Sequence, residues 1–268
     1  MILVFGGTSE TAGLAMALAQ SGHPVLVSTA TDAPLDVGVH PAIRRRCGRL
    51  DRDGIVALIV AESIRVVVDG SHPYALQLHA SVAAASQRAQ VPCFRYQRQM
   101  TAIAEEEGIC FVADHFAAAA LAVKFAVPVL LTIGSRQLDP YVELLKKHHI
   151  PLYARVLPYC ESEQLCERAG LPVESRIVGR GPFSETENRN LIRNKKIGLL
   201  VTKDSGIRGG VVEKISAARR ENCQVIVVRR PSVAPGFCQV FEDVGQLVAG
   251  VSRSLFLDVI RLENGRSV

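Results

Sequence analysis

GLLVTKDSGIRGGVVEKI, residues 198–215, has the pattern of a buried strand followed by a polar loop and a helix. We predict the strand over 197–202 and the start of the helix at about residue 210. The glycines of the loop permit backbone angles that other residues avoid and allow a ligand to approach closely. A helix that begins after such a loop directs its free N–H groups toward it. The stretch therefore predicts either an anion site in a parallel α/β sheet or a tight turn whose polar residues only cap the helix.

A second loop of the same kind stands near the start of the chain. A short apolar run is followed by GGTSE, residues 6–10, and then by a helix that Thr8 or Ser9 is expected to cap. A dinucleotide fingerprint occupies this place in many α/β proteins, although here the next glycine is Gly13 and the pattern is not Gly-x-Gly-x-x-Gly. The spacing is compatible with nucleotide binding. Glu10 in the first helical turn would repel a pyrophosphate placed directly against it.

The composition is that of a globular protein that binds small molecules. The chain has 268 residues, 48% of them hydrophobic and 21% charged, which suffices for one large or two ordinary domains. The net charge is +5, but aromatic residues make up only 5% and no nucleic-acid-binding element is recognisable. The charge therefore favours a small polyanionic ligand over nucleic acid, and the alternative is a basic surface without function.

The chain shows no sign of secretion, a membrane span or a metal site. It enters an apolar strand without a basic leader, and no apolar run approaches the roughly 20 residues that cross a bilayer. The seven cysteines are scattered, and no Cys-x-x-Cys occurs among them. We expect reduced thiols, no bound metal, no membrane partner and a cytoplasmic location.

Predicted strands and helices alternate along the whole chain and are joined by short loops. This alternation is typical of an α/β fold with mostly parallel sheets. The strands fall into two series, which predict two Rossmann-like domains with a cleft between them. We place these domains at residues 1–120 and 121–268, although no glycine- or proline-rich linker marks the boundary.

Polar residues follow several predicted strands, at the edge where ligands bind in open α/β sheets. Ser28 and Thr29 follow the second strand, and the nearby arginines 44–46 would tolerate a 2′-phosphate, so the choice between NADH and NADPH stays open. Gly134 and Ser135 end the first strand of the second series.

The segment Ser71-His72-Pro73-Tyr74 follows another strand. Pro73 restricts His72 to an extended backbone, and histidine can transfer a proton near neutral pH. A histidine that only hydrogen-bonds the following helical region is the alternative. Lys203 and Asp204 could bind a carboxylate and orient a donor, or form a surface ion pair.

Short motifs occur in a fixed order along nearly the whole chain. The N-terminal half contains GGTxE (6–10), SxAT (28–31), CGRL (47–50), DxSHPYA (69–75) and RYxR (95–98). The C-terminal half contains GPFS (181–184), TKDSG (202–206), GG (209–210), EKI (213–215) and RRP (229–231). Together they resemble the precorrin-6A reductase family of cobalamin biosynthesis. CGRL and SxAT are more similar to the cobalt-dependent branch.

The resemblance implies that a hydride from NADH or NADPH reduces the C18=C19 double bond of a precorrin-6A macrocycle. The substrate would be a tetrapyrrole with several acetate and propionate groups, and any cobalt would belong to it. The proton would come from solvent, His72 or Tyr74. Other enzymes of the cobalamin pathway are candidate partners.

The resemblance also implies site residues. The nucleotide side would comprise Gly6, Gly7, Thr8, Ser28, Thr29, Ser71 and His72. The cleft would comprise Gly134, Ser135, Lys203, Asp204, Ser205 and Gly206. Two alternatives stay open: another NAD(P)-dependent reductase or epimerase of the short-chain type, whose usual Tyr-x-x-x-Lys the chain lacks, and a non-catalytic nucleotide-binding sensor.

Overall fold

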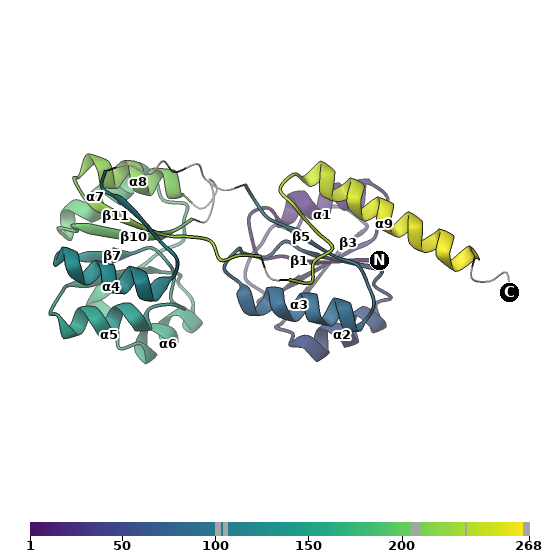
Figure 1. Cartoon of the computed structure of the whole chain (residues 1–268), viewed down its shortest axis with the longest axis horizontal. Helices are drawn as coiled ribbons and strands as arrows, with labels where there is room; N and C mark the ends of the chain where they lie inside the picture. The colour runs from purple at the N-terminus through teal and green to yellow at the C-terminus, as the bar shows by residue number, and fades with distance from the viewer. Residues whose placement is uncertain (100–102, 104–106, 205–209, 234, 265–268) are drawn as a thin grey trace. The chain divides into compact units, whose positions relative to one another are not determined.

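The chain forms two parallel α/β units. The computed structural model describes residues 1–99, 103, 107–204, 210–233 and 235–264. Unit 1 contains Met1–Arg98 and Ser232–Val268, and unit 2 contains Gln99–Pro231. Each unit holds a six-stranded parallel sheet with helices on both faces, which confirms the predicted fold class (Figure 1). Within the described residues, no helix combines the length and apolarity that a membrane span needs.

Unit 1 is built on sheet A, whose strand order is β12-β5-β4-β1-β2-β3. Its strands are β1 (Ile2–Phe5), β2 (Val25–Thr29), β3 (Ile43–Cys47), β4 (Val66–Asp69), β5 (Cys93–Tyr96) and β12 (Gln239–Phe241). Its helices are α1 (Thr11–Gln20), α2 (Arg52–Ala61), α3 (Leu76–Arg88) and α9 (Val244–Asn264).

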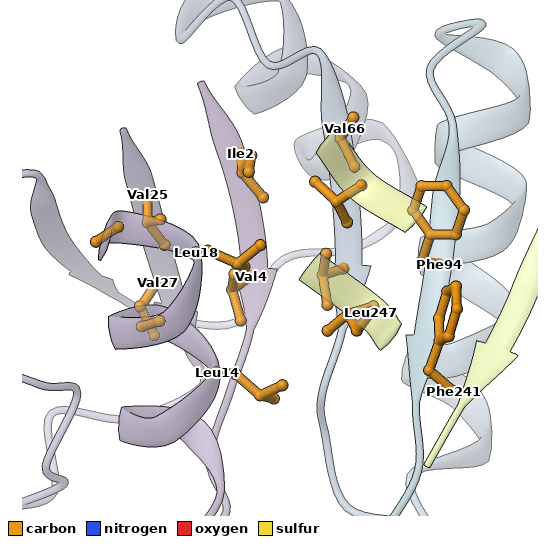
Figure 2. Packing of buried hydrophobic residues seen from close by; sticks show 14 residues of the cluster. Ile2, Val4, Leu14, Leu18, Val25, Val27, Val66, Phe94, Phe241 and Leu247 are labelled. Atoms are coloured by element: carbon orange, nitrogen blue, oxygen red, sulfur yellow. The ribbon is translucent and has the colours of Figure 1, made fainter. Parts of the chain in front are cut away.

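The strands of sheet A are apolar along their whole length because both faces are covered by helices. Ile2 and Val4 pack on one face with residues of α1 and α9, as Figure 2 shows. Leu3 and Phe5 alternate with them and pack on the other face, against α2 and α3. A continuous apolar run in the sequence therefore corresponds to a strand buried on both sides.

The end of the chain returns to unit 1. Strand β12 pairs with β5, and α9 packs on α1. This division differs from the expected boundary at residue 120, because residues 99–120 lie in unit 2 and residues 232–268 lie in unit 1. The pairing joins segments that are far apart in the sequence, so no local pattern could indicate it.

Unit 2 is built on sheet B, with strand order β6-β11-β10-β7-β8-β9. Its strands are β6 (Ile109–Val112), β7 (Val129–Leu131), β8 (Leu152–Val156), β9 (Arg176–Val178), β10 (Leu199–Lys203) and β11 (Gln224–Val228). Its helices are α4 (His115–Phe125), α5 (Asp139–Lys147), α6 (Cys160–Arg168), α7 (Glu185–Asn194) and α8 (Val211–Arg220), with a 3₁₀ turn at Val173–Ser175. Helices α7 and α8 cover one face, and α4, α5 and α6 cover the other (Figure 1).

Local signals account for several of these boundaries. Ser184 caps α7: its hydroxyl accepts a hydrogen bond from the N–H of Glu187, whose carboxylate accepts from the Ser184 N–H. Helix α8 follows Gly210, which has a left-handed φ of 66°. The predicted strand, loop and helix of residues 198–215 thus correspond to β10, the connecting segment and α8.

The strand orders define one switch point in each sheet. In sheet A, β1 lies between β2, the next strand in the sequence, and β4, which begins the other half of the sheet. In sheet B, β7 lies between β8 and β10 in the same way. Loops that follow the two strands at such a point diverge to opposite faces and leave room for a ligand at the carboxyl edge.

We expect Leu247→Ala to lower the free energy of unfolding by about 2–5 kcal/mol, since this α9 side chain is completely buried. The matched control is Leu257→Ala on the same helix, where the side chain is 52% exposed and the change should stay within about 0.5 kcal/mol. Denaturant titrations followed by circular dichroism measure both. Equal effects of the two substitutions would contradict the packing of α9 on sheet A.

Candidate functional site

The loop after β1 leaves its backbone open at Gly7. This residue has a φ of +116°, and no heavy atom lies within 4 Å of the position that a Cβ would take. A Cβ on Gly6 would instead lie 2.5 Å from the Thr11 side chain, so only glycine fits there. The two glycines therefore have different roles: Gly6 permits close packing of the loop on α1, and Gly7 offers space for a ligand.

Thr11 holds this loop in place, and the sequence did not indicate it. Its hydroxyl oxygen accepts hydrogen bonds from the N–H groups of Gly7 and Thr8, both at 3.1 Å. The expected cap by Thr8 or Ser9 is wrong: Glu10 is the N-cap residue of α1, and no side chain caps it. Thr11, the first residue of α1, therefore accepts the hydrogen bonds of the loop amides.

Thr8 connects the two loops of the switch point. Its side chain is buried, and its hydroxyl donates to the carbonyl oxygen of Gly70 at 3.3 Å. A small pocket lies here, lined by Thr8, Glu10, Gly70, Ser71, Pro73, Tyr96, Gln97 and Arg98. The predicted residues Gly6, Gly7, Thr8 and Ser71 thus share one end of sheet A.

Arg98 offsets the negative charge of Glu10, which would otherwise repel an anion at this loop. Its Nη2 lies 3.1 Å from Oε2 of Glu10, and both side chains are largely buried. The pair places a guanidinium in the wall of the same pocket. Glu10 is therefore compatible with an anionic ligand at this point.

A buried network around Asp69 fixes the second loop. Asp69 ends β4 with no exposed surface, and its Oδ2 lies 2.7 Å from Nδ1 of His79. Its Oδ1 lies 2.9 Å from Nη1 of Arg95 and accepts from the Ser71 hydroxyl at 2.6 Å. Arg95 also donates to the carbonyl oxygen of Ser71, and His79 Nε2 faces that of Pro73. The sequence pointed to Ser71 but not to this group, because its members come from three different elements.

The network keeps Asp69 ionised. Burial alone raises the pKa of this carboxyl, but the hydrogen bond from His79 and the charge of Arg95 outweigh burial and hold the pKa below its ordinary value. The loop that carries residues 70–74 is therefore held by a charged centre inside the fold.

His72 and Tyr74 lie on this loop but do not line the pocket. Both are partly exposed, and Nδ1 of His72 accepts a hydrogen bond from the N–H of Tyr74 at 3.3 Å. Their ring centroids are 5.8 Å apart. The structure thus brings the two predicted catalytic residues together, beside the switch point of sheet A.

Ser28 and Thr29 end β2 beside two arginines. Nη1 of Arg46 donates to the Ser28 hydroxyl at 2.8 Å, and Nε of Arg45 donates to that of Thr29 at 3.1 Å. The contact follows from the parallel pairing of β2 with β3, which the sequence did not predict as a strand. The third arginine, Arg44, instead pairs with Glu62 at 2.7 Å.

The predicted residues of unit 2 gather at the switch point of sheet B. Gly134 follows β7 with a φ of +79°, and no heavy atom lies within 4 Å of the position of a Cβ. Lys203 ends the neighbouring strand β10. Asp204 is buried, and its carbonyl oxygen accepts from Nε of Arg230 at 2.8 Å. Ser205 and Gly206 lie outside the described residues.

Lys203 is a readily neutralised cation. Burial, and then the charge of Arg136, lower the pKa of Lys203 to about 8. Its ammonium group is therefore charged at neutral pH and loses its charge under mildly alkaline conditions.

Other reactive side chains form no cofactor site in the part of the chain that the structure describes. All seven cysteines are free thiols. No group of three His, Cys, Asp or Glu side chains within the described ranges is placed to hold a metal ion.

Asp69→Asn should lower the free energy of unfolding at pH 7 by about 3–5 kcal/mol, because it breaks a buried ion pair. Since folding lowers the pKa of Asp69, the wild-type advantage exists above the unfolded pKa of about 3.9 and should shrink as the pH falls below that value. Denaturant titrations at several pH values measure this.

Asp53→Asn is the control for this substitution. Asp53 is 70% exposed and pairs with Arg88 at the surface, so its loss should change the free energy of unfolding by less than about 1 kcal/mol. A constant difference between wild type and Asp69→Asn from pH 7 to pH 3 would contradict the ionised, stabilising role of Asp69.

Comparisons with known proteins agree with this architecture over nearly the full length. A family model described as "Precorrin-6x reductase CbiJ/CobK" matches residues 1–252. The chain is 29% identical over 256 residues to the cobalt-precorrin-6A reductase of Priestia megaterium, covering 95% of this chain and 100% of the relative. It is 32% identical over 232 residues to the cobalt-precorrin-6A reductase of Salmonella typhimurium, covering 86% and 88%.

A solved structure, "CobK precorrin-6A reductase", has the same fold. It matches with a TM-score of 0.71 and 25% sequence identity, over 94% of this chain and 96% of that one. The ordered motifs, the two parallel sheets and the whole-length matches lead to one assignment. The chain belongs to the precorrin-6x reductase CbiJ/CobK family and is an oxidoreductase.

Proposed function

We propose that this protein reduces the C18=C19 double bond of precorrin-6A to give precorrin-6B in corrin ring biosynthesis, with a reduced nicotinamide as hydride source. The whole-length family match carries the proposal. Six of the relatives compared are named for cobalt-precorrin-6A and two for precorrin-6A, which favours the cobalt form of the substrate. The metal would enter as part of that substrate.

The end of sheet A fits a dinucleotide. Gly7 exposes its backbone beside the N-terminus of α1, where an anion is favoured, and Arg98 offsets the charge of Glu10. Because Thr11 occupies the amides of Gly7 and Thr8, we assign the contact to the open face of Gly7 and to neighbouring polar groups. When bound, a reduced nicotinamide supplies a hydride. Gly6, Thr8 and Ser71 shape the site that orients it.

We extend the proposal to NADPH as the preferred form. Dinucleotide folds read the ribose 2′ position at the end of the second strand, and an arginine there accommodates a 2′-phosphate. Here Arg45 and Arg46 lie against Thr29 and Ser28 at that position. Their two guanidinium groups provide the positive charge that a phosphate requires.

The end of sheet B would receive the substrate. Gly134 leaves open space beside Ser135, and Lys203 carries a positive charge at neutral pH, which suits the acetate and propionate groups of the macrocycle. Asp204 would position Arg230, to which its carbonyl oxygen is bonded. Ser205 and Gly206 remain candidates from the sequence.

The proton that accompanies the hydride would come from His72 or Tyr74. The two groups are neighbours on one loop, and the Asp69 network fixes that loop from inside the fold. Histidine can donate a proton near neutral pH.

The reaction is tested by anaerobic absorbance spectroscopy of the purified protein with precorrin-6A or its cobalt form, with NADH and NADPH added separately. A changed macrocycle spectrum, matched by loss of reduced nicotinamide, is the expected result. Nucleotide binding without turnover of either substrate would contradict the reductase and favour a sensor.

Arg46→Gln should reduce the ratio of kcat/KM for NADPH to that for NADH by about 10- to 100-fold, the loss expected for one charged hydrogen bond. Arg44→Gln is the matched control, because Arg44 lies on the same strand and pairs with Glu62 instead. Initial rates with both cofactors measure the ratio. The same ratio in both variants would reject a 2′-phosphate site at the end of β2.

His72→Ala should lower kcat by about 10²- to 10⁴-fold while the cofactor Kd stays unchanged, as for loss of a general acid. Tyr74→Phe tests the neighbouring donor, and His148→Ala, at an exposed histidine, is the control. Single-turnover rates and NADPH fluorescence titrations give the two quantities. Wild-type turnover in both His72→Ala and Tyr74→Phe would assign the proton to another source.

A further inference from the structure

Three polar side chains lie on the inner surface that α7 and α8 cover in unit 2. Leu131 of β7 pairs with Ala154 of β8 and with Val201 of β10. The next residues along the two outer strands, Arg155 and Thr202, therefore lie at the same height in the sheet, on opposite sides of β7. Leu200 packs with residues of α7 and α8. Because residues two apart share a face, Thr202 points to the same side. The third side chain, Glu213, comes from α8 itself.

Each of these side chains has a buried atom without a hydrogen-bond partner among the described residues. The atoms are Nε of Arg155, Oγ1 of Thr202 and Oε2 of Glu213. Thr202 has no exposed surface, and Arg155 is only 8% exposed. Buried polar groups in native proteins are almost always satisfied, and an exception in a native fold indicates an unseen partner. Two of these exceptions, Arg155 and Thr202, have groups that can donate and lie at the same level of sheet B, which indicates a site for an anion.

Two neighbours hold the guanidinium of Arg155 in a fixed orientation. Its Nη1 donates to the amide oxygen of Asn188 at 2.7 Å, and its guanidinium lies 4.0 Å from the centre of the Phe183 ring. These contacts orient the side chain and leave Nε unused. The group is therefore pre-organised as a donor.

This region carries an excess of positive charge. The charged groups that act on one another here include the cations Arg155, Lys203, Lys214 and Arg136 and the carboxylates Glu213 and Glu187. Burial, and then the charges of Arg155 and Lys203, lower the pKa of Lys214 to about 8, so the cations act on one another. The excess of positive charge suits an anionic group such as a carboxylate.

We propose that Arg155, Thr202 and Lys214 form a subsite for one carboxylate of the tetrapyrrole substrate. Nε of Arg155 and the hydroxyl of Thr202 donate to its oxygens, and Lys214 supplies the balancing charge. This inference rests on the proposed function, since it names residues that recognise that substrate.

The test compares Thr202→Val with the wild-type protein. Valine keeps the volume and removes the hydroxyl, so KM for cobalt-precorrin-6A should rise about tenfold or more, the loss typical of a hydrogen bond to a charged group. The Kd for NADPH should remain within about twofold. Because the hydroxyl has no partner among the described residues, the Tm should stay equal or rise. A purely structural threonine would instead lower the Tm and leave KM unchanged.

Two further variants complete the experiment. Thr132→Val is the matched control, because its hydroxyl already donates to the carbonyl oxygen of Val201 at 3.1 Å. Arg155→Lys keeps the charge but loses Nε, and should raise KM at similar kcat. Absence of turnover in the wild type would reject the proposed function. Wild-type turnover with KM unchanged in Thr202→Val would overturn the subsite alone.

Discussion

Parallel pairing of β1 with β4, and of β7 with β10, brings chemically unlike loops to the same edge of each sheet. In a parallel sheet every carboxyl end meets at one edge, so a glycine-rich turn and a polar turn from distant parts of the chain become neighbours. The candidate nucleotide residues meet in this way at sheet A, and the candidate substrate residues at sheet B. Helix packing on both faces stabilises the pairing, and the loops need only supply the chemistry.

An ionised side chain in the interior sets the geometry of one of these loops. Burying Asp69 is costly unless donors compensate it, and His79, Arg95 and Ser71 do so from α3, β5 and the loop itself. The same arginine bonds the loop backbone, so the charge and the loop are fixed together. In unit 2, Arg155 and Thr202 instead have buried atoms that no group of the described residues satisfies. One network completes the fold, and the other set of groups forms the subsite that we propose for a substrate carboxylate.

Local sequence patterns were sufficient for the fold class, most strands and helices, and the position of the glycine loops. They did not indicate contacts between distant segments. The pairing of β12 with β5 returns the end of the chain to unit 1, and the pairing of β3 with β2 brings Arg46 beside Ser28. The sequence did not indicate Thr11, because its hydroxyl, in the first turn of α1, accepts a hydrogen bond from a residue that precedes the helix. The motifs named Ser71 and Lys203, while the buried partners around them required three-dimensional structure.

Hydride transfer from nicotinamide to macrocycle is the central claim, and isotope transfer tests it most directly. The protein would be incubated anaerobically with cobalt-precorrin-6A and NADPH deuterated at both C4 positions, and the product analysed by mass spectrometry. We predict a product that carries one deuterium from the cofactor, with unlabelled product from unlabelled NADPH in deuterium-free buffer. A reduced product without cofactor-derived deuterium would contradict direct hydride transfer.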